Sequence, residues 1–319
     1  MKKPGLFGGG AIATPAPPEP ERYAKALAHP LPMSQTYKTT AINLKAIPLG
    51  ETDRLLTLLS PDVGLVRVVA PGSRKHQSRL GGRSDLFVVN DCLIVKGKQL
   101  DKLVQAETRR TFPGLSQHLG RLTASQYLAE VVLLMALSDC PQDALFQVLV
   151  EHLGRLETTA PGALLAALCH GLYHLLALAG VAPEVHQCTL SRVAIVPNLL
   201  DPAWRVEFSA EAGGLIQLTE ANPGDALVAE TAGRYGEGTQ RPVLLTATDV
   251  ALLQQLSKPE ILSTLPMGLP TGLRDDAPGL GKNQQLWSRV ERLLREYIQD
   301  YFERPIRSAA LVDVCFATV

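Results

Sequence analysis

The pattern of hydrophobic and polar positions divides the chain into two parts. Between residues 36 and 112 it forms short extended runs, which read TYKTTAINLKAIPL, RLLTLLS, LVRVVAPG, DLFVVNDCLIVKG and KLVQAETRRTF. GETD and PDVG lie between them, and proline and glycine in PDVG are typical of a tight turn. These runs, within about 75 residues and mostly without a helix-length apolar period between them, predict a small antiparallel barrel. In LVRVV, Arg67 alternates with two valines, so its side chain is expected to point away from the core.

After residue 115 the apolar period becomes helical. Helices are predicted over residues 115–139, 141–157 and 161–180, and again over 247–258 and 283–303, with short strands and turns from about residue 186. The expected buried positions of the first helix are Leu115, Leu119, Leu122, Tyr127, Val131 and Leu134, and those of the last are Leu286, Val290, Leu293, Tyr297 and Tyr301.

The third helix has two features that call for an interpretation. Residues 158–183 carry no charge, so a membrane span is conceivable, but His170, Gly171 and His174 interrupt the stretch and no basic anchors flank it. A central buried helix is therefore expected, and no membrane. His170 and His174 have the spacing of two zinc ligands on one helix face, yet HGLYH lacks the glutamate of H-E-x-x-H and no third ligand is evident. Both histidines are expected to be structural.

Charge adds an asymmetry that the whole-chain balance hides. The chain has 31 basic and 31 acidic residues, but residues 35–115 carry a net charge of +6 and residues 116–319 a net charge of −8. A basic five-stranded barrel suggests an OB-fold, whose strand face and loops bind oligonucleotides.

The densest positive charge lies in GSRKHQSRLGGR, residues 72–83, which would join the third and fourth strands. Such a loop neutralises phosphates with little regard to base sequence and with a steep dependence on salt. The candidate DNA contacts are Arg74, Lys75, Arg79 and Arg83 in the loop and Arg54, Arg67, Lys96 and Lys98 in a wider strip, with Arg109 and Arg110 as weaker candidates. Few aromatic residues are near, so base stacking is a weak part of the hypothesis. The plainer alternative is a solvated surface loop.

Other motifs narrow the function further. The five cysteines are scattered and form no C-x-x-C pair, which favours free thiols in a reducing cytoplasm. A Walker loop, a G-x-S-x-G elbow, a Gly-rich dinucleotide loop and a convincing acid pair are all missing from the sequence, so no enzyme activity is expected.

Five stretches together resemble the RecO family of bacterial DNA repair and recombination mediators. They are LKAIPLGETDRLLTLLSPDVGLVRVVAPGSRK, SRLGGRSDLFVV, TASQYLAEVVLLMAL, GLYHLLALAGVAPEVHQC and FERPIRSAALV, in the family's order. The resemblance implies an α+β multi-domain fold: an OB-fold domain (35–115), a helical domain (116–185 and 225–319) and a small zinc-module-like insertion (186–224). Residues 1–34 carry glycine and proline runs with almost no apolar periodicity, which predicts a disordered tail. The resemblance also implies a protein without covalent catalysis that binds single- and double-stranded DNA, anneals complementary strands and, with RecR, assists RecA loading on DNA coated by single-strand-binding protein.

One departure from the family concerns zinc. Zinc-binding members carry two C-x-x-C pairs, whereas the corresponding positions here are Cys188 with Ser191, and Gln217 with Glu220. Structural zinc sites use cysteine and histidine almost exclusively. With one of four thiolates left, the module is expected to hold its shape by packing, with no metal and no cofactor.

A rival hypothesis from another class remains open. The barrel could contact an acidic segment of a partner protein and never nucleic acid, because OB-folds host such roles and a fold does not settle function. The salt dependence of DNA binding separates this protein-interaction adaptor from a DNA-binding protein.

Overall fold

The computed structural model describes residues 36–218, 243–261 and 280–316. The predicted disordered tail, residues 1–34, lies outside the described residues. So does Glu220, one of the four positions of the predicted zinc module.

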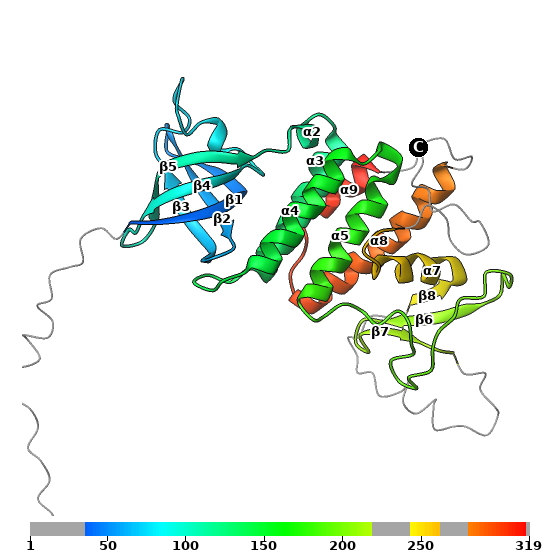
Figure 1. The fold of residues 1–319 in the computed structure, drawn as a ribbon. Helices are drawn as coiled ribbons and strands as arrows, with labels where there is room; N and C mark the ends of the chain where they lie inside the picture. Colours follow the sequence, from blue (N-terminus) through cyan, green and yellow to red (C-terminus); the bar gives the residue numbers. More distant parts are fainter. Residues whose placement is uncertain (1–35, 219–242, 262–279, 317–319) are drawn as a thin grey trace, which may run out of the picture. The chain divides into compact units, whose positions relative to one another are not determined.

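The first part of the chain is a closed five-stranded barrel (Figure 1). Its strands are β1 (Thr36–Leu49), β2 (Asp53–Ser60), β3 (Gly64–Ala70), β4 (Val89–Val95) and β5 (Asp101–Arg110). Neighbours follow the order β1-β2-β3-β5-β4, antiparallel except where β3 pairs with β5, and β4 returns to β1. The turn at PDVG joins β2 to β3, with Gly64 at a positive φ of 73°. The barrel predicted from the alternating pattern is confirmed.

Strand alternation separates the inside of the barrel from its surface. Leu56, Leu58, Val68, Ile94 and Leu103 are almost fully buried together in the interior. Arg67, the neighbour of Val68, is exposed on the outside, as the two-residue period predicts.

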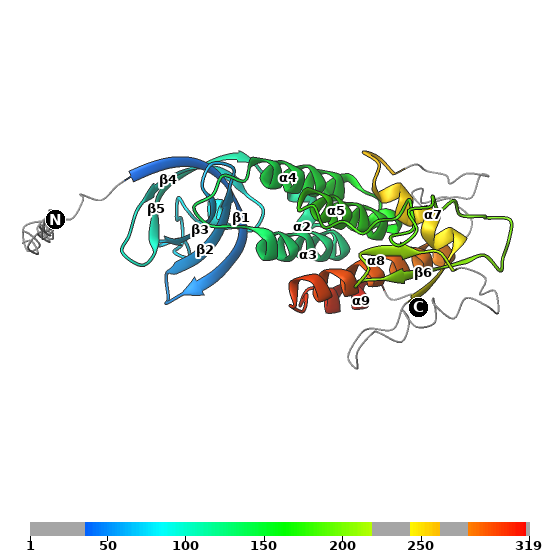
Figure 2. The ribbon, with the colours of Figure 1, turned by 90° about the horizontal axis from the view of Figure 1, so that it is seen from below.

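The rest of the described chain is mainly helical. Its helices are α2 (Pro113–Ser116), α3 (Leu119–Met135), α4 (Asp143–Thr158), α5 (Leu164–Leu178), α7 (Ala247–Leu256), α8 (Leu280–Phe302) and α9 (Ala309–Cys315). Helix α5 contacts α3, α4 and α8, and lies among them in Figure 2. The stretch Pro161–Leu178 has the length and hydropathy of a membrane span, but 67% of it is buried inside the protein. That burial is the sign of a core helix, as the sequence predicts, and the α+β fold is confirmed.

Two residues differ from the expected helix faces, and one helix was not predicted. Leu119, expected to be buried, is exposed because α3 begins there, and Tyr301 is exposed in the last turn of α8. Helix α9 was not predicted. It begins where the carboxylate of Glu130 accepts hydrogen bonds from the backbone N–H of Arg307 at 2.9 Å and from that of Ser308 at 2.8 Å. A carboxylate at that place satisfies amides that lack partners within the helix.

Residues 183–218 contain little regular structure apart from a small sheet. Strand β6 (Arg205–Ser209) pairs antiparallel with β7 (Gly214–Ile216) on one side and β8 (Val243–Thr246) on the other. Because β8 lies beyond residue 224, this sheet takes one strand from the range that the sequence assigned to the helical domain. The zinc-module-like character of the insertion stays a prediction.

The barrel joins the helical part through both backbone and side chains. The N–H of Leu65 donates to the carbonyl of Leu137 at 2.8 Å, and the N–H of Gln142 donates to the carbonyl of Pro61 at 2.8 Å. Ile42 and Leu59 of the barrel belong to the same buried apolar core as the helices. The basic barrel is thus anchored to the helices at its β2–β3 turn.

Candidate nucleic-acid interface

The basic loop between β3 and β4 is held in a series of turns. Its first part is fixed by the backbone N–H of Gly72, which donates to the Asp53 carboxylate at 2.8 Å, and by that of Arg74, which donates to the Thr52 carbonyl at 2.9 Å. Its last part forms a short 3-10 helix, Gly82–Ser84. These contacts hold the loop at both ends.

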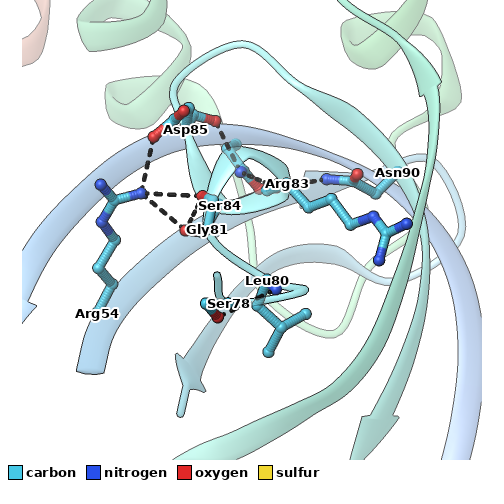
Figure 3. Close-up of polar contacts among 9 residues, drawn as sticks. Arg54, Ser78, Leu80, Gly81, Arg83, Ser84, Asp85 and Asn90 are labelled. Atoms are coloured by element: carbon cyan, nitrogen blue, oxygen red, sulfur yellow. Dashed lines mark hydrogen bonds and ion pairs between the residues drawn. The ribbon is translucent and has the colours of Figure 1, made fainter. Parts of the chain in front are cut away.

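Two buried asparagines secure the end of the loop. The side-chain amides of Asn43 and Asn90 both donate to the carbonyl of Arg83 at 2.9 Å. Asn43 also donates to the carbonyl of Asp85 at 2.8 Å. These bonds use the backbone of Arg83 and leave its half-buried side chain, which donates to the Arg79 carbonyl at 3.0 Å, at the loop surface (Figure 3).

Arg54, one of the predicted DNA contacts, bonds to the end of the loop. Its guanidinium forms an ion pair with Asp85 at 2.7 Å and donates to the Ser84 hydroxyl at 2.8 Å and the Gly81 carbonyl at 3.3 Å (Figure 3). Arg54 therefore fixes the end of the loop from β2 through one guanidinium nitrogen, Nη1.

Replacing Arg54 with alanine is expected to lower the free energy of unfolding by about 1–2 kcal/mol, because it leaves the Ser84 hydroxyl and the Asp85 carboxylate without their donor. Amide hydrogen exchange of Ser84 should become faster. The matched control is Arg67→Ala on the neighbouring strand, an exposed position where the change should stay within about 0.5 kcal/mol. Equal stability and equal exchange in the two variants would contradict this role of Arg54.

The strongest candidate contacts lie between the two fixed ends. Arg74, Lys75 and Arg79 are all exposed. The guanidinium of Arg74 donates to the Gly50 carbonyl at 2.9 Å, whereas the side chains of Lys75 and Arg79 make no hydrogen bond within the described parts of the chain. The loop thus presents three cations from a fixed backbone, which is suited to an extended polyanion.

The rest of the wider strip lies on β3 and in the β4–β5 connection. Lys96 and Lys98 are exposed in the β4–β5 connection and make no hydrogen bond or ion pair with the loop among the described residues. Arg67 lies on the outer face of β3, opposite Thr57, which in turn lies opposite Lys45 on β1. Lys45 is exposed, and the sequence did not identify it as a candidate contact. Its position in line with Arg67 follows from the pairing register of β1, β2 and β3, which the sequence does not show.

The weaker candidates and the aromatic residues have structural partners. Arg109 pairs with Asp91 at 2.6 Å, and the guanidinium of Arg110 lies over the ring of Phe112, 4.5 Å from its centre. Phe87 and Phe112 are buried. The expectation that base stacking contributes little therefore agrees with the positions of these rings.

Three of the four predicted zinc-module positions, Cys188, Ser191 and Gln217, lie together around the Cys188 sulfur atom. Sγ of Cys188 accepts the backbone N–H of Ser191 at 3.4 Å and that of Gln217 at 3.3 Å. Burial raises the pKa of the Cys188 thiol, but the hydrogen bonds from Ser191 and Gln217 outweigh burial and lower the pKa to about 7. The turn that surrounds the sulfur is therefore present, with an amide side chain at 217 where a thiolate would stand.

Comparison with known proteins assigns both parts of the chain to the same family. The model for the N-terminal part of recombination protein O matches residues 33–112, and the model for its C-terminal part matches residues 116–235. The chain is 49% identical over 291 residues to the DNA repair protein RecO of a Cyanothece species, covering 89% of this chain and 98% of that protein. It is 49% identical over 290 residues to RecO of Gloeothece citriformis, covering 88% and 98%, and 45% identical over 305 residues to RecO of a Nostoc species, covering 89% and 98%. The chain therefore belongs to the RecO family of DNA repair and recombination proteins.

Proposed function

We propose that the chain binds single- and double-stranded DNA through the barrel and anneals complementary strands, and that with RecR it assists RecA loading onto DNA coated by single-strand-binding protein. The observation that carries the proposal is the row of exposed cations, Arg74, Lys75 and Arg79, on a loop whose backbone is fixed at both ends. A fixed loop loses little conformational entropy on binding, so more of its electrostatic attraction to phosphate becomes affinity.

Annealing sets a physical requirement that this surface meets. Two polyanions must be gathered without either being locked in place. Contacts to phosphates allow sliding and exchange while they raise the local concentration of strands. The burial of Phe87 and Phe112 supports the same mechanism, because base stacking would hold one strand and hinder its pairing with the other.

The direct test is the triple change of Arg74, Lys75 and Arg79 to alanine. If each contacts one phosphate, the slope of log affinity against log salt should flatten by about two units for single-stranded DNA and by up to about three for duplex. Fluorescence anisotropy of labelled oligonucleotides over a salt series measures both slopes.

A matched triple variant removes the same charge from the helical part: Arg292, Arg304 and Arg307, all exposed, each changed to alanine. This control should keep the parent slope. An unchanged slope in the loop variant would remove the loop from the DNA site. A parent protein that does not bind DNA would favour the rival protein-interaction adaptor.

The proposal also covers the binding partners, the cellular location and the absence of a catalysed reaction. The partners are DNA, RecR and single-strand-binding protein, with RecA reached indirectly, and the location is the cytoplasm. The protein acts by binding and not by a covalent step. In support, the described candidate residues are all lysines and arginines, without a nucleophile and base placed together among them.

We also propose that the module around Cys188 holds no zinc. Ser191 and Gln217 offer neutral oxygen or amide groups in place of thiolates. Such groups are poor structural zinc ligands. Cys188→Ser is therefore expected to leave the metal content of the protein unchanged.

A further inference from the structure

Three histidines from two helices lie close together. His170 and His174 lie one turn apart on α5, and His152 approaches them from α4. One ring nitrogen from each residue lies within 4.8 Å of the others, and Nε2 of His152 is 3.1 Å from Nδ1 of His174. His152 and His170 are each only 2% exposed, and His174 is half-buried. The structure thus supplies the third histidine that the spacing of His170 and His174 alone could not reveal.

The outer nitrogens of the α5 pair share one acceptor. Nε2 of His170 lies 2.8 Å and Nε2 of His174 lies 3.1 Å from the carbonyl oxygen of Lys258, just after α7. A carbonyl can only accept, so both rings carry a proton on Nε2. The guanidinium of Arg155 can only donate, so Nδ1 of His170 keeps its lone pair. Metal-binding histidines have this arrangement, with the non-coordinating N–H donated to a backbone carbonyl or carboxylate.

Arg155 is the group that competes with an ion. Its guanidinium lies 3.2 Å from Nδ1 of His170, and it also donates to the Pro259 carbonyl at 2.9 Å and pairs with Glu151 at 2.5 Å. These two other partners remain when the contact with His170 is given up. The Glu151 carboxylate also offsets one positive charge beside the cluster.

We propose that His152, His170 and His174 form a binding site for a divalent transition-metal ion, with Zn²⁺ as the expected occupant. Imidazole nitrogen suits zinc and its neighbours in the first transition row, and three histidines leave one coordination position for water. The ion would link α4 to α5, and through the Lys258 carbonyl it would fix the end of α7. This proposal does not depend on DNA binding.

The test uses the full-length, untagged protein after removal of metal with a chelator. Titration with Co²⁺, followed by visible absorption, should show about one tetrahedral or five-coordinate ion per chain, and Zn²⁺ should displace it. Elemental analysis after reloading with Zn²⁺ gives the stoichiometry independently. A parent protein that binds neither ion in a one-to-one ratio would overturn the proposal.

Three variants locate the ion. His174→Ala should weaken Co²⁺ affinity at least about tenfold, because one of three ligands is gone. Cys188→Ser should bind Co²⁺ with the affinity of the parent protein. Loss of the ion in this variant, with retention in His174→Ala, would place the ion elsewhere and overturn the proposal.

Arg155→Gln should bind Co²⁺ several-fold more tightly than the parent protein, because a competing cation is removed. That gain cannot come from misfolding, whereas weaker binding in this variant would count against the site.

Discussion

Replacing Arg295 with methionine is expected to lower the free energy of unfolding by about 3–5 kcal/mol, because it leaves a buried carboxylate without its counter-charge. Arg295 is 14% exposed and bonds Glu291 through two nitrogens, at 3.0 and 2.6 Å. The same guanidinium bonds Asp313 on α9 at 2.8 and 2.7 Å. Urea denaturation at neutral pH measures the loss.

The pH dependence of this variant tests the cause. Burial raises the pKa of Glu291 above the ordinary 4.5, and Arg295 opposes that rise. Without Arg295 the folded-state pKa should rise further. A carboxyl group whose pKa is higher in the folded state than in the unfolded state stabilises the fold in its protonated form. This contribution to the free energy of unfolding is lost as the pH rises through the folded-state pKa. The deficit of the variant should therefore be largest at neutral pH and shrink as pH falls toward 4.5.

Two further variants separate charge from packing. Changing both Glu291 and Arg295 to methionine should recover most of the stability, because no unpaired buried charge remains. Asp313→Asn, at a carboxylate that is 57% exposed, should lower the free energy of unfolding by less than about 1 kcal/mol. If the double variant is no more stable than Arg295→Met, the loss comes from packing and not from the buried charge.

The sequence predicted the structure best where the hydrophobic positions repeat with a single period along one strand or helix. Alternation in LVRVV placed Val68 inside the barrel and Arg67 outside it, because a strand has only two faces. The helical period located α3 to α5 and α8, but it placed Leu119 and Tyr301 on buried faces. Both residues lie in a terminal turn of a helix, where neighbouring elements no longer cover the apolar face of the helix.

The candidate site was predicted less completely because its details depend on contacts distant in sequence. Charge density identified the loop at Arg74, Lys75 and Arg79, which the structure places at the surface. It could not show that Arg54 is bound to Asp85, 31 residues away, or that Lys45 shares a row with Arg67. Register and side-chain partners of this kind follow from the folded barrel and leave no local pattern.

A methyl group at Gly64 is expected to disturb the junction between the barrel and the helices. Gly64 has a φ of 73°, and a Cβ there would overlap the carbonyl oxygens of Leu137 and Cys140. The left-handed backbone costs about 1–2 kcal/mol in alanine. Overlap with backbone that is already hydrogen-bonded to Leu65 adds about 1–3 kcal/mol. Gly64→Ala should therefore lower the free energy of unfolding by about 2–5 kcal/mol in chemical denaturation.

Two other glycines supply the controls for this prediction. Gly50 has nearly the same φ, 62°, and a methyl group added there would meet no atom within 4 Å, so Gly50→Ala measures the backbone cost alone. Gly82 has neither a positive φ nor a close neighbour, and Gly82→Ala should be close to neutral. The excess loss in Gly64→Ala over Gly50→Ala is the part due to the junction, and hydrogen exchange at the Leu65 amide should rise with it. Equal losses at Gly64 and Gly50 would mean that the junction yields to the methyl group without measurable cost, and that the barrel is not tightly held against Leu137.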